Sequence, residues 1–126
     1  MGLFSFGNRE TDKPKLQWTS IQTIDALEKA IASTEDIPGL FFKHSTRCSI
    51  SSMALNRFEN DWENTPKCQL FFIDLIAHRE VSNKLSELSG VLHQSPQVIV
   101  LKNAESIYDA SHSGISAHEI LTLLDA

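Results

Sequence analysis

The chain has 126 residues, of which 41% are hydrophobic and 21% are charged, and its formal net charge at pH 7 is −5. This composition is typical of one packed domain and excludes both a disordered chain and two independently folded enzyme domains. The lysines and arginines are scattered along the sequence, so it lacks the clustered basic surface that nucleic-acid binding requires.

The sequence also gives expectations about location. Its apolar stretches are far shorter than a membrane span. The first eight residues (MGLFSFGN) lack the early positive charge and the long apolar segment of a signal peptide. Two cysteines separated by nineteen residues do not form a disulfide framework. We therefore expect a cytoplasmic protein with neither nucleic acid nor membrane as a partner.

Residues 1–15 are expected to be a loosely ordered lead-in, because their second half is polar and contains a proline. A single domain is predicted over residues 16–126, with a short strand over 16–19. Apolar residues at helical spacing predict a first helix over residues 20–33, with Thr19 or Ser20 as its N-cap.

A short aromatic strand is predicted over residues 40–43, followed by an amphipathic helix over residues 48–62. This helix is expected to bury one side, formed by Ile50, Met53, Ala54, Leu55, Phe58 and Trp62. The later elements are predicted as strands over 68–75, 97–101 and 106–110 and helices over 81–88 and 116–124.

The turn at residues 102–105 should join the last two strands in a hairpin. Right-handed crossovers make the first strands parallel. Together these elements predict an α/β fold, with a mixed sheet of four to five strands and helices on both faces.

Cys48 stands where a predicted strand passes into a helix. The free N–H groups and the positive dipole end of that helix favour a thiolate over a thiol. Arg47, Lys43 and His44 add positive charge that favours the thiolate further if their side chains turn toward it. The alternative is an inert buried cysteine, because free cysteine is among the most buried residue types.

Pro96 immediately precedes the strand over 97–101. Proline is disfavoured inside a central strand, so it must begin this one. A cis bond here would expose the backbone of Ser95, which could pair with an extended ligand that carries a thiol. A trans proline in a turn is the alternative.

Three sequence fragments resemble those of the monothiol bacilliredoxins, a thioredoxin-like family of bacteria that use bacillithiol as their small thiol. The fragments are Lys43 to Ser51 (KHSTRCSIS), Ser95 to Gln97 and Ala110 to His112. The resemblance extends from about Leu16 to the C-terminus.

The resemblance implies a thioredoxin-like fold in which Cys48 attacks bacillithiol mixed disulfides on client proteins. Ser95 and Pro96 would form a docking edge, and Thr46 and Arg47 would contact the substrate beside it. Three residues would tune the thiolate, namely Lys43, His44 and Ser51. Bacillithiol would be the exchange co-substrate, with no bound cofactor.

Two positions depart from related patterns. Ser49 occupies a position where the family usually has proline, which would suit the first helical turn. Ser51 stands where a thioredoxin-type Cys-x-x-Cys motif would place its second thiol, so no disulfide can form across this motif. The predicted mechanism is therefore monothiol. Cys68 opens a predicted strand and is expected to be structural and remote from Cys48, whereas a resolving role would require the two Cα atoms to come within about 7 Å.

Other site types fit the sequence less well. His44, His93 and His112 are interpreted as polar loop residues, and His78 and His118 as solvated. Metal-ligand spacing and glycine-rich phosphate loops are absent from the sequence. A hydrolase could pair Cys48 with His112 and with Asp74 or Asp109, but the sequence around such a base is missing.

The competing function is a non-catalytic thioredoxin-like binding module or a thiol redox sensor, in which Cys48 is oxidised or capped. Turnover distinguishes the two hypotheses, because a sensor reacts once per molecule whereas an exchange catalyst releases many clients.

Overall fold

The structure is a computed structural model that describes residues 16–125, so the expected lead-in over 1–15 lies outside the described residues. The elements follow in the order β1 (Thr19–Ser20), α1 (Ile24–Ser33), β2 (Gly39–His44), α2 (Ser49–Asp61), β3 (Gln69–Asp74), α3 (Arg79–Ser89), β4 (Gln97–Lys102), β5 (Glu105–Ser111), the short 3-10 helix η2 (His112–Gly114) and α4 (Ala117–Asp125).

The strands form one sheet in the order β1-β3-β2-β4-β5. β1 and β2 both run parallel to β3, which confirms the prediction that the first strands are parallel. β4 is antiparallel to β2, and β5 is antiparallel to β4. The predicted mixed α/β fold with a terminal hairpin is therefore confirmed.

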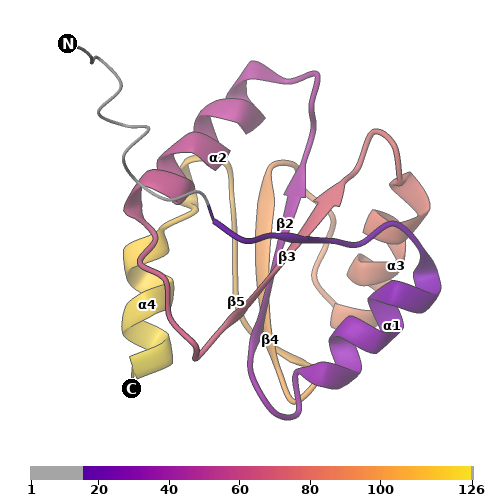
Figure 1. Ribbon diagram of the computed structural model, residues 1–126. Helices are drawn as coiled ribbons and strands as arrows, with labels where there is room; N and C mark the ends of the chain where they lie inside the picture. Colours follow the sequence, from indigo (N-terminus) through magenta and orange to yellow (C-terminus); the bar gives the residue numbers. More distant parts are fainter. Residues whose placement is uncertain (1–15, 126) are drawn as a thin grey trace, which may run out of the picture.

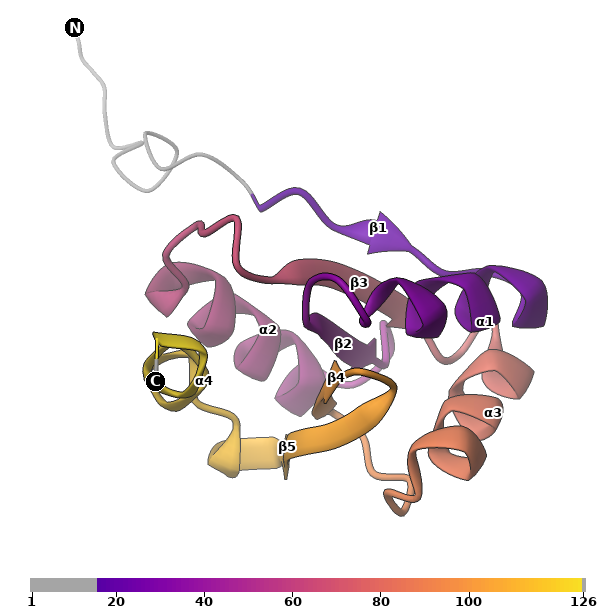
Figure 2. The ribbon, with the colours of Figure 1, turned by 90° about the horizontal axis from the view of Figure 1, so that it is seen from below.

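The helices cover the sheet from both sides, with α2 and α4 on one face and α1 and α3 on the other (Figures 1 and 2). Successive side chains of a strand point to opposite faces. Accordingly Phe42 packs in the cluster beneath α2 and α4, whereas its neighbour Phe41 packs in the cluster beneath α1 and α3. β2 is thus buried on both faces, which explains its continuous apolar sequence.

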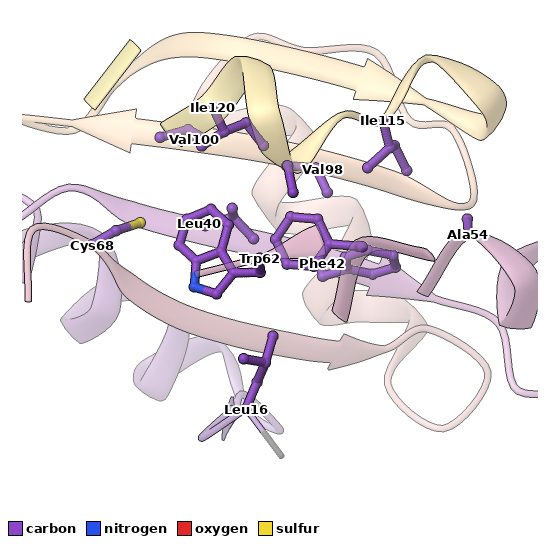
Figure 3. Packing of buried hydrophobic residues seen from close by; sticks show 12 residues of the cluster. Leu16, Leu40, Phe42, Ala54, Trp62, Cys68, Val98, Val100, Ile115 and Ile120 are labelled. Atoms are coloured by element: carbon purple, nitrogen blue, oxygen red, sulfur yellow. The ribbon is translucent and has the colours of Figure 1, made fainter. Parts of the chain in front are cut away.

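The cluster beneath α2 is rich in aromatic side chains (Figure 3). Phe58 lies between Phe42 and Trp62, with ring centroids 5.7 and 5.2 Å away, and Trp62 is 2% exposed. Trp18 packs against Phe42 and Phe58 from the edge, and its Nε1–H donates to Glu59. Both tryptophans therefore serve packing.

The prediction for the start of the first helix is wrong. α1 begins at Ile24, and its N-cap is Thr23, whose Oγ1 accepts from the N–H of Ala26. The preceding residues continue the pairing with β3 instead, since the N–H of Ile21 donates to the carbonyl of Phe72 at 2.9 Å. Strand pairing at this edge prevails over the helical spacing of the apolar residues.

The prediction for the buried side of the second helix is wrong at two positions. Ile50 and Met53 are 58% and 67% exposed, whereas Ala54 and Phe58 are buried as predicted. The polar Ser51 occupies a buried position in the first turn instead. Ser51 is satisfied there by hydrogen bonds to His44 and Ser45, which apolar spacing does not reveal.

The turn of the β4–β5 hairpin has two residues in the left-handed region, Asn103 with φ 55° and Ala104 with φ 65°. Both N–H groups are held by the buried Thr34, whose carbonyl accepts from Asn103 and whose Oγ1 accepts from Ala104, each at 2.8 Å. The turn after α1 thereby fixes the hairpin at this end of the sheet.

Candidate active site around Cys48

Cys48 is the N-cap residue of α2. Its N–H donates to the carbonyl of Ser45, and its own carbonyl accepts the first helical hydrogen bond, from the N–H of Ser52. The side chain is half-buried and makes no capping hydrogen bond. The sulfur therefore lies at the positive end of a 13-residue helix, where the first-turn N–H groups have no helical partners.

A buried pair of side chains joins β2 to α2 beneath the loop that carries Cys48. The Oγ of Ser51 lies 2.7 Å from Nδ1 of His44, and it also accepts from the N–H of Ser45 at 3.0 Å. These contacts hold the chain on both sides of residues 45–48. They fix where the loop presents the sulfur.

His44 is not an ordinary polar loop residue, so that interpretation is corrected. It is the last residue of β2, is 7% exposed, and packs its ring against Phe72. Burial lowers the pKa of His44, and the negative charges of Asp74 and Glu59 oppose this effect. The hydrogen bond to Ser51 therefore belongs to an imidazole with a reduced tendency to carry charge.

Lys43 points away from this pair. Successive residues of a strand project to opposite faces, so Lys43 reaches beneath α3. Its Nζ donates to Oγ of Ser86 at 2.7 Å and to Nδ1 of His93 at 3.2 Å. Lys43 is fully buried, and burial together with the charge of Arg79 lowers its pKa to about 8. Its ammonium is directed to the face opposite α2 rather than toward Cys48.

Ser95 and Pro96 lie beside the Cys48 loop. Lys43 of β2 is paired with Gln97 of β4, and in an antiparallel ladder the next residue back, Pro96, comes opposite His44. The Ser95–Pro96 peptide bond is cis, which decides between the two alternatives left open by the sequence. The carbonyl of Pro96 accepts from the N–H of His112, whereas Ser95 forms no hydrogen bond within residues 16–125.

The remaining predicted site residues lie at the same end of the sheet. Thr46 and Arg47 are exposed in the loop immediately before Cys48. Thr46 and Arg47 thus precede Cys48 in its loop, Ser95 lies in the neighbouring segment before β4, and His44 and Ser51 form a hydrogen-bonded pair at the junction of β2 and α2. Lys43 alone, of the residues predicted to act there, faces elsewhere.

Cys68 lies at the opposite end of the sheet, as expected. It precedes β3, whose Gln69 is paired with the first residue of β2, whereas Cys48 follows the last residue of β2. Six strand residues at about 3.3 Å each separate these ends, far beyond the reach of a disulfide. Burial raises the pKa of the Cys68 thiol to about 12, and the thiol donates to the carbonyl of Gln69.

The geometry offers no support for the other site types. No hydrogen bond joins Cys48 to a histidine within residues 16–125, and the carboxylate of Asp74 accepts from Ile76 and Ala77 instead. In the same part of the chain there is no group of three or more His, Cys, Asp or Glu residues suited to a metal ion.

The sequence did not indicate that His93 forms hydrogen bonds with buried residues. It is half-buried, and its Nδ1 contacts Ser82 as well as Lys43, so the interpretation as an ordinary loop residue is corrected. Gln97, which is 2% exposed, was also missed. The remaining histidines are an exposed His112 and His118 and a half-buried His78 that caps α3.

Comparison with solved structures identifies the fold. A structure described as having a thioredoxin fold superposes with a TM-score of 0.71 and 22% identity, covering 85% of this chain and 92% of that chain. Thioredoxin from Malassezia sympodialis superposes with a TM-score of 0.66 and 16% identity, covering 90% of this chain and 92% of that chain. Fasciola hepatica thioredoxin superposes with a TM-score of 0.64 and 15% identity, covering 84% of this chain and 95% of that chain. The fold is therefore that of thioredoxin.

A family model described as monothiol bacilliredoxin BrxC matches residues 19–120, a range that includes the whole sheet and all the site residues named above. None of the helices in the described range has the length and apolarity needed to span a lipid bilayer. The chain belongs to the monothiol bacilliredoxin family, and its function is thiol–disulfide redox chemistry.

Proposed function

We propose that the protein removes bacillithiol from mixed disulfides on client proteins. The Cys48 thiolate attacks the bacillithiol sulfur, a new disulfide forms between them, and the client sulfur leaves as a thiolate that takes a proton from water. A second bacillithiol thiolate then attacks the bacillithiol sulfur on Cys48. This step forms bacillithiol disulfide and releases the Cys48 thiolate for another cycle.

The position of Cys48 is the observation that carries the proposal. Its sulfur is half-buried at the N-terminus of α2 and is not engaged in capping the helix. A thiolate there is favoured by the helix dipole and by the nearby positive charge of Arg47. An attacking sulfur must also remain accessible, which an inert buried cysteine does not.

Ser95 supports the docking of the mixed disulfide. Its backbone forms no hydrogen bond to the rest of residues 16–125, and the strand register places it next to the Cys48 loop. An extended segment on either side of the mixed disulfide could pair with this backbone, in the manner of an added strand. Thr46 and Arg47, exposed in the loop immediately before Cys48, would contact the same substrate.

Ser51 supports a monothiol mechanism. A second thiol in its place could displace the captured bacillithiol, but a hydroxyl cannot form a disulfide. Ser51 instead binds His44 and Ser45, and Cys68 lies at the other end of β2. Cys48 therefore depends on an external thiol for its release. Such a cycle requires a supply of reduced small thiol, and we place it in the cytoplasm.

The decisive experiment uses a client protein capped with bacillithiol and an excess of free bacillithiol. We expect the wild type and the matched control Cys68→Ser to release many equivalents of client thiol above the rate with bacillithiol alone, and Cys48→Ser to add nothing to that rate. Release of a single equivalent per molecule would instead identify a thiol sensor. Undiminished release by Cys48→Ser would refute the assignment of the nucleophile.

The same client capped with glutathione tests the choice of small thiol. A slower reaction with the glutathione-capped client is expected if the protein recognises bacillithiol itself. Equal rates would show that the protein acts on small-thiol mixed disulfides in general.

A further inference from the structure

Lys43 is a buried cation that the exchange chemistry does not use. It is fully buried, and its hydrogen-bond partners within residues 16–125 are the uncharged Ser86 and His93 rather than a carboxylate. Burial of a charge without an opposite charge costs stability. An apolar side chain of similar length would fill the same space without that cost, so the lysine requires an explanation other than packing.

The contact between Lys43 and His93 defines the state of the imidazole. An ammonium group has hydrogens to donate and no lone pair to accept with. Nδ1 of His93, 3.2 Å from Nζ of Lys43, must therefore be the unprotonated nitrogen, which places the ring hydrogen on Nε2. The pKa of His93 is lowered by burial and by the charges of Lys43 and Arg79, which agrees with a neutral ring.

His93 belongs to the segment of residues 90–96 that joins α3 to β4 and ends at the proposed docking edge. Gln97 holds this segment from the strand, since its Nε2 donates to the carbonyl of Leu92 and its Oε1 accepts from the N–H of Gln94. His93 holds it from the interior, through Lys43 and Ser82. Of these contacts, the one to Lys43 connects the segment directly to β2.

β2 is also the strand that leads into the Cys48 loop. One residue after Lys43, His44 fixes that loop through Ser51. Two adjacent residues of one strand thus hold the two parts of the site from opposite faces of the sheet. We propose that Lys43 and His93 are positioning residues that set the Ser95–Pro96 edge against the Cys48 sulfur, an inference that rests on the proposed exchange function.

The test compares two reactions of Cys48 in the variants Lys43→Met and His93→Leu. Exchange with a bacillithiol-capped client needs docking, whereas alkylation by iodoacetamide needs only a reactive, accessible sulfur. We expect exchange to slow by about tenfold, the effect of losing one hydrogen bond to a charged group. We expect alkylation to stay at the wild-type rate.

Two further variants separate positioning from general damage. His93→Asn restores exchange, because the amide oxygen of asparagine can accept from Lys43 near the place of Nδ1. Lys84→Met is the matched control for the loss of a lysine, since Lys84 on α3 pairs with Glu87 outside this network. Equal exchange rates for His93→Asn and His93→Leu, or a parallel loss of alkylation, would overturn the proposal.

Amide hydrogen exchange over residues 91–95 tests the proposal without turnover. Faster amide hydrogen exchange is expected in Lys43→Met and His93→Leu, but not in His93→Asn or Lys84→Met. Unchanged amide hydrogen exchange in all four variants would refute the positioning role. If the wild type releases no bacillithiol, the proposed function fails, and this measurement still decides the role of Lys43 and His93.

Discussion

The two ends of β2 differ in the side chains that they bury. At the end that leads to Cys48, the interior contains polar groups, namely Lys43, His44, Ser51, Ser82 and Gln97. At the end beside Cys68, the interior is apolar apart from Thr34, which fixes the hairpin turn. Cys48 follows one end of β2 and Cys68 lies beside the other, so the two cysteines have different environments.

This difference shows how one small sheet separates chemistry from stability. Polar groups cost free energy when they are buried, even with hydrogen bonds. Within residues 16–125, five of the six buried polar side chains lie at the end where we propose that a reactive sulfur and a docking edge need fixed positions. The aromatic cluster beneath α2 supplies much of the apolar burial that supports the domain.

The largest expected difference is in cysteine reactivity. The pKa of Cys68, raised from 9.0 to about 12 by burial, leaves about 1000-fold less thiolate than an ordinary cysteine has near neutral pH. Iodoacetamide should therefore modify Cys48 in the native protein and leave Cys68 intact until urea unfolds the chain. Mass mapping of the modified peptides measures this, and native labelling at Cys68 would remove the contrast between the two ends.

The next effect concerns alkaline pH. Between pH 8 and 10.5 the unfolded chain holds a proton on Lys43 that the folded chain releases, so raising the pH through this window favours folding. The fall in the pKa from 10.5 to about 8 corresponds to about 3 kcal/mol. Urea titrations should show this gain relative to Lys43→Met. If both proteins respond identically, Lys43 is not the buried cation described above.

A smaller loss is expected from Ser51→Ala, which leaves the N–H of Ser45 without its acceptor. The cost should be about 1–3 kcal/mol of unfolding free energy, the penalty for an unsatisfied buried polar group. Ser52→Ala is the control, because Ser52 lies in the same helix and makes no side-chain hydrogen bond within residues 16–125. An equal change in the two variants would argue against the Ser51 network.

A gradual effect is expected at acidic pH. The pKa of His44 lies below its ordinary value of 6.5 in the folded chain, so the unfolded chain takes up a proton first as the pH falls. Unfolding free energy should therefore decrease below about pH 6.5. His93 contributes in the same direction. The double variant His44→Asn, His93→Asn should flatten the profile, and an unchanged slope would assign it to other groups.

The sheet and helices followed from local patterns, because apolar spacing and turn residues act over a few positions. Cys48 and the Ser95–Pro96 edge were identified from short motifs. The directions of Lys43 and His44 could also have been inferred, since neighbouring strand residues face opposite ways. The contact between Lys43 and His93 could not, because it joins residues fifty positions apart through a packed interior.

The hairpin turn at the apolar end suggests where the protein could be made more robust. A two-residue turn with positive φ at both positions suits Asn-Gly, but this chain has alanine at the second position, at φ 65°. A left-handed alanine costs about 1 kcal/mol, which Ala104→Gly should largely recover. The N–H that Thr34 accepts is kept in that variant. Because the turn lies at the far end of the sheet from Cys48, stability can be engineered there without altering the redox centre.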